Sequence, residues 1–152
     1  MTDLRQVFDD LVRYETILWG TIDGRLQEEC GISLASLNGM LVIDATPLCR
    51  VHDIARAVAI TVGGASQAVD RLESAGFVAR RANPSDRRSS IVELTPEGVE
   101  LLGIAAPVFD RELDRLLGAP MPGPALTRLA DALATLRRSA AAQAGSPVPA
   151  EP

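Results

Sequence analysis

The chain has 152 residues, of which 47% are hydrophobic, and this length allows one domain with a buried core. No uncharged apolar run approaches the roughly 20 residues that span a bilayer. The N-terminus has an early acid, Asp3, where a signal peptide would be basic and then apolar. These features exclude a membrane span and a secretory leader, so we expect a cytoplasmic protein without membrane contact. Two cysteines are too few for a disulfide framework.

The net charge of −5 at pH 7 argues at first sight against binding to nucleic acid, but the charge is unevenly distributed. Residues 1–29 hold seven acids and three arginines, whereas residues 50–90 hold seven arginines and four acids. A local basic surface matters more for a phosphate backbone than the total charge does. The middle of the chain is therefore the candidate binding region.

The first half of the chain predicts helices. Apolar residues at helical spacing indicate a long first helix that ends near Gly31; they are Leu4, Val7, Phe8, Leu11, Tyr14, Ile17, Leu18 and Ile22. Ser33 is a suitable N-cap for a second helix, which Thr46-Pro47 breaks. Residues 48–51 are expected to form a short strand.

Two closely spaced helices follow. His52 or Asp53 opens a third helix, and Thr61 caps a fourth that runs to Ala75 and ends at Gly76. The side chains expected to be buried in the fourth helix are Val62, Ala65, Val69 and Leu72. This spacing is typical of a helix-turn-helix arrangement.

A β-hairpin is predicted next, with strands at residues 77–81 and 90–94 and turn residues at 83–86. Thr95-Pro96-Glu97 begins a fifth helix that continues through Leu117. Residues 118–124 are a rigid break, leucines from Leu126 to Leu136 define a last helix, and residues 145–152 form a disordered tail. The fold class is mainly α with a small hairpin wing.

The fourth helix offers candidate DNA contacts on its exposed face, namely Thr61, Ser66, Gln67 and Arg71. The Gln67 amide suits adenine in a major groove, and Ser66 suits a base or a phosphate. Gly63 and Gly64 carry no side chain to hold the helix off the DNA, so their backbone N–H groups are placed to approach a phosphate. Alternatively, the two glycines merely loosen the first helical turn.

The hairpin tip carries Arg87 and Arg88, which are suited to a narrow minor groove where the potential is most negative. Asp86 is expected to accept a hydrogen bond from an arginine or a loop amide and so fix the shape of the loop. Arg80 and Arg81 add positive charge on the same hairpin and are further candidate DNA contacts. The alternative is a solvated polar turn without a ligand.

Three motifs stand in succession: Asp70-Arg71-Leu72-Glu73-Ser74-Ala75-Gly76-Phe77-Val78 with Arg80-Arg81, then Asn83-Pro84-Ser85-Asp86-Arg87-Arg88, then Leu94-Thr95-Pro96-Glu97-Gly98. Together they closely resemble the MarR family, the multiple-antibiotic-resistance regulators. The clear likeness covers about 30 residues, and the order of helices agrees over nearly the whole chain. Family members usually have small polar residues in place of Gly63 and Gly64, and a glycine is common at the position of Ala59.

The resemblance implies a homodimeric winged-helix repressor that binds a pseudo-palindromic operator in double-stranded DNA, with half-sites about one helical turn apart. Residues 32–94 would form the winged helix-turn-helix region, and residues 1–31 and 95–144 the helical dimerisation region. Asp86 and Arg88 occupy the family's Asp-x-Arg wing positions. Many members are released by small aromatic or phenolic ligands, and no cofactor is implied.

Ligand and sensor residues are few. Tyr14 and Trp19 on the first helix are candidate walls for an aromatic effector, although packing in the core or at a dimer interface is the simpler explanation. Cys49 precedes Arg50 and is a candidate redox sensor, whereas Cys30 follows two glutamates that disfavour its thiolate. Cys49 and His52 have metal-ligand spacing, but a zinc site needs three or four protein ligands, so no metal is expected.

The sequence also bears on two further function classes. An enzyme is disfavoured because the chain has no lysine, a single histidine and no nucleophile motif. A winged-helix dimer that binds a protein partner, or senses oxidants through Cys49, without ligand-controlled release from DNA is the alternative to a DNA-binding regulator.

Overall fold

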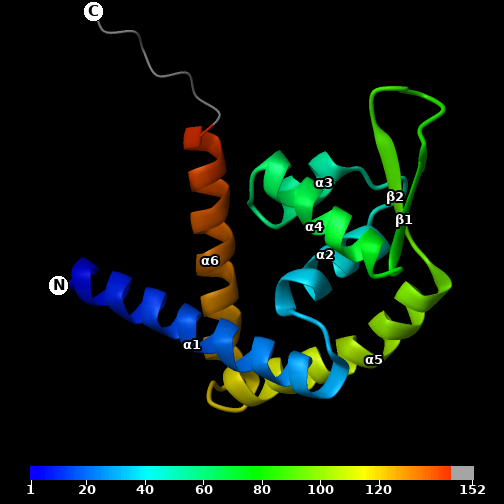
Figure 1. Cartoon of the computed structure of the whole chain (residues 1–152). Helices are drawn as coiled ribbons and strands as arrows, with labels where there is room; N and C mark the ends of the chain where they lie inside the picture. The colour runs from blue at the N-terminus through cyan, green and yellow to red at the C-terminus, as the bar shows by residue number, and fades with distance from the viewer. Residues whose placement is uncertain (145–152) are drawn as a thin grey trace, which may run out of the picture. The chain divides into compact units, whose positions relative to one another are not determined.

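A computed structural model describes residues 1–144 of the chain (Figure 1). The tail predicted at residues 145–152 lies outside these described residues. The chain divides into two compact units, residues 1–112 and residues 113–152. Within the described part there are six α-helices and one antiparallel hairpin, which confirms the mainly α fold with a small wing. No helix among residues 1–144 combines the length and the apolar character needed to cross a bilayer.

Helix α1 (Leu4–Cys30) begins at Asp3, whose side chain accepts a hydrogen bond from Arg5 N at 2.9 Å, and ends at Gly31 with φ +68°. The predicted apolar face exists, but only its C-terminal end, at Ile22 and Leu26, is buried. Further toward the N-terminus the apolar side chains stay exposed, and Phe8 is 67% accessible. This half of α1 therefore presents an uncovered apolar surface.

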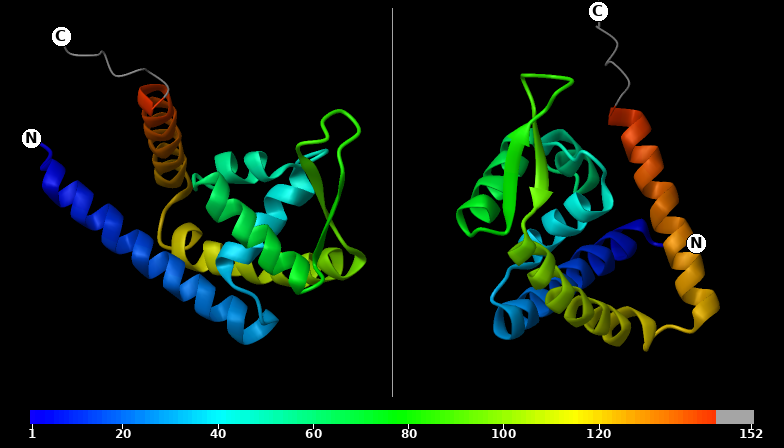
Figure 2. Two further views of the ribbon diagram at one scale, coloured as in Figure 1. Left: turned by 45° about the horizontal axis from the view of Figure 1, so that its top comes forward. Right: turned by 90° about the vertical axis from the view of Figure 1, so that its right-hand side faces the viewer.

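Helices α2 (Leu34–Ala45), α3 (Val51–Ala57) and α4 (Val62–Ser74) form the core of the first unit together with the hairpin (Figure 2). The predicted cap Ser33 accepts a hydrogen bond from Ser36 N at 3.1 Å. The interior is built from side chains of all these elements: Leu37, Met40, Ile54, Ala65, Val69, Leu72, Ile91 and Val92. Each large apolar side chain buried here stabilises the fold by about 1.5–3 kcal/mol.

The strand predicted at residues 48–51 is wrong. Arg50 N donates to Asp53 Oδ2 at 2.9 Å, and this contact from the first turn back to the preceding residue starts α3 at Val51. Leu48 has a positive φ of 51°, which turns the chain before it can extend. What remains of the strand pairing is the hydrogen bond from Val92 N to Cys49 O at 2.8 Å.

The turn between α3 and α4 confirms Thr61 as a helix cap, because its Oγ1 accepts a hydrogen bond from Gly64 N at 3.0 Å. Just before it, Ala59 adopts a φ of +56°. This left-handed conformation explains why glycine suits this position better than alanine, which is strained there.

Strands β1 (Val78–Ala82) and β2 (Ser90–Leu94) pair with Arg80 opposite Val92 and Arg81 opposite Ile91. Helix α5 (Pro96–Leu113) follows directly. Thr95 joins three elements, because its Oγ1 donates to Gly76 O at 2.6 Å and accepts from Gly98 N at 3.1 Å. A Cβ at Gly98 would collide with the Phe77 carbonyl oxygen, so a glycine is required where α5 begins.

The fifth helix does not continue regularly through Leu117 as predicted. It changes after Leu113 into a π-helical turn, η1 (Asp114–Gly118), and the second compact unit begins at the same residue. A Cβ at Gly118 would lie 2.5 Å from Asp114 Oδ1, the end of a flexible side chain that can move aside, so this contact does not by itself require glycine. The expected last helix is α6 (Gly123–Ala144).

Candidate nucleic-acid interface

The outer face of α4 is defined by residues at helical spacing: Gly63, Gln67, Asp70 and Ser74 are exposed and lie opposite the buried Ala65, Val69 and Leu72. Thr61 and Arg71 are also exposed, whereas Ser66 is half-buried. Val62 was expected in the core but is 43% exposed, because it lies in the first turn, ahead of the first buried residue, Ala65. The predicted base-reading residue Gln67 therefore sits at the centre of an open helix face.

The two glycines in this helix have different surroundings. The Gly64 amide already donates to Thr61, and a Cβ added there would lie 3.2 Å from Thr61 Oγ1. The idea that both amides are available to a phosphate is therefore wrong for Gly64. A Cβ at Gly63 would meet no atom within 4 Å, so a ligand has access to the backbone there.

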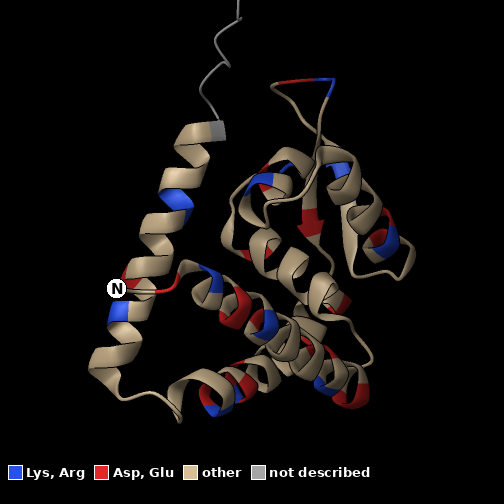
Figure 3. Ribbon diagram, turned by 90° about the vertical axis from the view of Figure 1, so that its left-hand side faces the viewer, with Lys and Arg blue, Asp and Glu red and all other residues tan. Residues whose placement is uncertain are grey.

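The tip of the hairpin is held in shape by side chains of its own loop. Asp86 Oδ1 accepts a hydrogen bond from Arg88 N at 2.9 Å, as predicted, and Asp86 Oδ2 accepts one from Ser89 Oγ at 3.3 Å. Asn83 Nδ2 donates to Ser89 Oγ at 3.1 Å across the loop. Figure 3 shows the acidic and basic segments adjoining at the tip. The loop is therefore an ordered turn.

The arginines of the hairpin fall into two groups. At the base, Arg80 Nη2 lies 2.7 Å from Asp70 Oδ1 and Nη1 lies 3.5 Å from Glu73 Oε1, while Arg81 Nε lies 2.8 Å from Glu93 Oε1. At the tip, Arg87 and Arg88 are exposed and form no ion pair with any residue in the described part of the chain. The free positive charge of the hairpin is thus concentrated at its tip.

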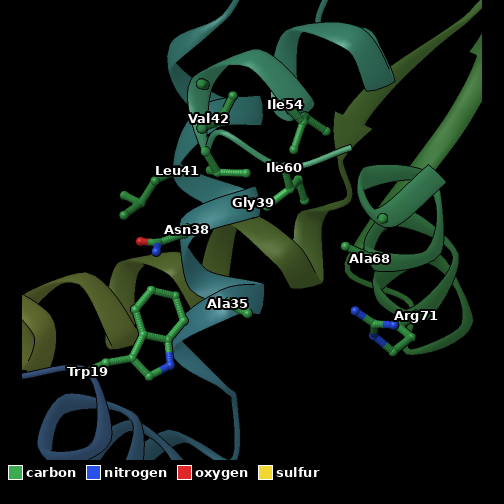
Figure 4. A pocket seen from close by; sticks show the side chains of 13 residues that line it. Trp19, Ala35, Asn38, Gly39, Leu41, Val42, Ile54, Ile60, Ala68 and Arg71 are labelled. Carbon is green, nitrogen blue, oxygen red and sulfur yellow. The ribbon is translucent and has the colours of Figure 1, made fainter. Parts of the chain in front are cut away.

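A pocket of about 450 Å³ lies among α1, α2, α3 and α4 (Figure 4). Its walls are mainly apolar, with the Trp19 indole on one side and the Arg71 side chain on another. Of the two predicted ligand residues, Trp19 lines this pocket and Tyr14 does not. Sequence reasoning placed Arg71 only on the DNA-facing surface and overlooked Asn38 and Ile60, which also line the pocket.

A sequence feature could have indicated this pocket. Val58 and Ile60 are apolar residues beyond the end of α3, where neither belongs to the helix face that packs into the core. Apolar side chains in a short connection need either burial or a ligand.

The cysteines have environments that suppress reactivity. Cys49 is 1% exposed, and burial together with Asp53 raises the pKa of its thiol to about 11. Burial and Glu29 raise the pKa of Cys30, with Arg111 acting in the opposite direction. A redox sensor needs an accessible thiol with a lowered pKa, so this geometry does not favour the role proposed for Cys49. Among residues 1–144, no three His, Cys, Asp or Glu side chains gather as metal ligands would.

Comparison with known proteins agrees with this architecture. Residues 31–90 match the MarR family model. The HTH-type transcriptional regulator BilQ of Clostridium symbiosum is 34% identical over 94 residues, which cover 62% of this chain and 65% of BilQ. Over residues 31–90 the chain is therefore similar to MarR-family regulators. The match thus spans slightly less than two thirds of the length of this curated relative.

Solved MarR-family structures share the fold over nearly the whole chain. The MarR-family regulator Sco3205 of Streptomyces coelicolor, solved in complex with DNA, has a TM-score of 0.85 and 24% identity over 91% of this chain and 92% of its own. BpsR of Bordetella bronchiseptica, whose DNA binding is regulated by 6-hydroxynicotinic acid, has a TM-score of 0.77 and 20% identity over 87% and 98%. The MarR family match includes α2, α3, α4 and the wing tip with Asp86 and Arg88.

Proposed function

We propose that this chain is a MarR-family, sequence-specific DNA-binding transcriptional regulator. The observation that carries the proposal is the pairing of an open helix face around Gln67 with a hairpin tip whose two arginines have no ion-pair partner among residues 1–144. A helix of this kind fits a major groove, and exposed arginines on a projecting loop fit the adjacent minor groove or backbone. The shared fold with the DNA-bound Sco3205 supports this arrangement.

The acting form in this proposal is a homodimer on a pseudo-palindromic operator. Helix α1 supports it, because its N-terminal half exposes Leu4, Val7, Phe8 and Leu11 in one apolar face. Exposed apolar stripes of this size usually meet a partner surface, and a two-fold axis would bring two copies of α1 together. Two wings would then reach half-sites about one helical turn apart.

The proposed control is release of a repressor from DNA by a small aromatic acid. The pocket brings an apolar lining, the Trp19 ring and the Arg71 guanidinium together, and this combination suits an aromatic ring bearing a carboxylate. Arg71 belongs to α4, so a ligand bound there acts directly on the DNA-reading helix. The regulation of BpsR by 6-hydroxynicotinic acid supports this class of ligand.

The DNA proposal is tested by selecting duplexes from a random-sequence library with the full chain and measuring their affinity over a range of salt concentrations. We expect an enriched palindromic sequence and a steep loss of affinity as salt rises, since phosphate contacts release counterions. A flat salt response or no enrichment would favour the alternative, a winged-helix dimer that binds a protein partner.

The ligand proposal is tested without DNA, because Trp19 is the only tryptophan in the sequence. Titration with 6-hydroxynicotinate or benzoate should change the fluorescence of Trp19, and Arg71→Gln should weaken this binding at least about tenfold. Tyr14→Phe is the matched control, because Tyr14 does not line the pocket. Equal binding by Arg71→Gln and the wild type would remove Arg71 from the ligand site.

A further inference from the structure

Helix α4 contains more acidic than basic residues, which is unexpected for a helix that reads DNA. Asp70 lies on the same outer face as Gln67, three residues or about 4.5 Å further along the helix axis. Glu73 follows within one turn, and both carboxylates are exposed, with Asp70 at 59%. Arg71 is the only cation in this helix. Two uncompensated carboxylates at this position would face the phosphates that flank any base contacted by Gln67.

Arg80 neutralises both of them. Its guanidinium lies 2.7 Å from Asp70 Oδ1 and 3.5 Å from Glu73 Oε1, and its backbone N donates to Glu73 Oε2 at 3.1 Å. The Arg80 side chain is only 24% exposed, far less than a cation that projects toward a ligand. One strand residue thus holds two helix carboxylates by three contacts.

We infer that Arg80 is a positioning residue that makes α4 compatible with DNA, and that it does not contact a phosphate itself. By pairing with Asp70 and Glu73, it reduces the repulsion between their carboxylates and the DNA phosphates. It also connects the base of the wing to α4. The inference rests on the proposed DNA-binding function. The sequence suggested that Arg80 contacts DNA directly. Its role in the same binding event is instead indirect, through Asp70 and Glu73.

The test compares four full-length proteins on the duplex that the wild type selects from a random-sequence library. Arg80→Gln leaves both carboxylates unpaired and is expected to weaken binding about tenfold or more. In the triple variant Arg80→Gln/Asp70→Asn/Glu73→Gln, helix α4 has no carboxylate left. Its affinity for the duplex should return to within about threefold of the wild type. Arg81→Gln is the matched control on the neighbouring strand position, because its partner Glu93 lies on β2.

The outcomes separate three roles for Arg80. If Arg80 binds a phosphate directly, the triple variant stays as weak as Arg80→Gln, and the inference is overturned. If Arg80 only stabilises the fold, the loss of DNA affinity in Arg80→Gln persists at high salt. Repulsion between carboxylate and phosphate is screened by salt, so under our inference the loss of affinity shrinks as salt rises. Recovery in the triple variant together with a shrinking defect supports the inference.

A second readout needs no DNA. The Arg80 guanidinium holds the Glu73 carboxylate beside the backbone amide of residue 80, which donates to it. Loss of the guanidinium should free that carboxylate, so amide hydrogen exchange at residues 78–82 should be faster in Arg80→Gln than in Arg81→Gln. Equal exchange in the two variants would contradict the tie between wing and helix. If the wild type selects no duplex, the proposed function fails, and hydrogen exchange still decides whether Arg80 holds the wing.

Discussion

The base and the tip of the wing contain the same residue type in opposite situations. Arg80 and Arg81 at the base are engaged by Asp70, Glu73 and Glu93, whereas Arg87 and Arg88 at the tip have no carboxylate partner among the described residues. The base therefore contributes order and little free charge, and the tip contributes charge on a loop that is already ordered. Counting arginines along a sequence does not reveal this division, because it depends on where the acids lie in space.

The largest effect is expected at the tip. Replacing Arg87 and Arg88 together by alanine removes both free cations and should weaken DNA binding by about 100-fold, with the salt slope reduced by about 2. Arg88→Ala alone should cost at least about tenfold. The measurement is fluorescence anisotropy on the selected duplex at several salt concentrations. Unchanged affinity in the double variant would remove the tip from the interface and with it the contrast between tip and base.

A smaller effect is expected from Asp86→Ala, and its direction is informative. Removing an acid next to DNA should strengthen binding if only charge matters. Because Asp86 holds the Arg88 amide and the Ser89 hydroxyl, we expect instead a loss of about five- to tenfold. Asp86→Asn, which keeps an acceptor, should retain most of the affinity. Tighter binding by Asp86→Ala would show that the order of the tip is irrelevant.

The sequence predicted the parts of this surface that depend on neighbouring residues. Thr61, Ser33 and Thr95 are helix caps whose partners lie three residues away, so local chemistry identifies them. The hairpin tip was also predictable, because the Asp86 contact with Arg88 spans two residues. By the same reasoning, the end of α1 at Gly31 needs only a residue that tolerates a positive φ.

Features that depend on residues distant in sequence were missed. Arg80 meets Asp70 ten residues earlier, and Arg81 meets Glu93 twelve residues later, so their neutralisation follows only from the folded arrangement. The pocket combines residues of four helices, which hid the second environment of Arg71. The π-helical turn after Leu113 was missed because leucines at helical spacing continue to Leu117.

A still smaller effect is expected at the base from Arg81→Gln. An exposed cross-strand ion pair contributes only about 0.2–1 kcal/mol, so DNA affinity should stay within about threefold of the wild type. Thermal unfolding and anisotropy on the same preparation would measure both quantities. A loss as large as that of Arg88→Ala would place a base arginine in the interface and contradict the division proposed for the wing.

The smallest effect is expected in the reactivity of Cys49, which probes the base of the wing in the unsubstituted protein. Its carbonyl pairs with Val92 on β2, and its thiol is buried with a pKa of about 11. A raised pKa means less thiolate at every pH below it, so at about pH 8 a thiol reagent should react with the partly exposed Cys30 first. Binding of DNA to the tip should not change the rate at Cys49. Rapid reaction of Cys49 in the native protein would show that the base opens readily.

The division between tip and base is tested most directly by arginine-specific modification with phenylglyoxal, read by mass spectrometry with and without the selected duplex. We expect Arg87 and Arg88 to react quickly in the free protein and to be protected by DNA, while Arg80 and Arg81 react slowly in both states. Stronger protection by DNA at Arg80 than at Arg88 would contradict the account.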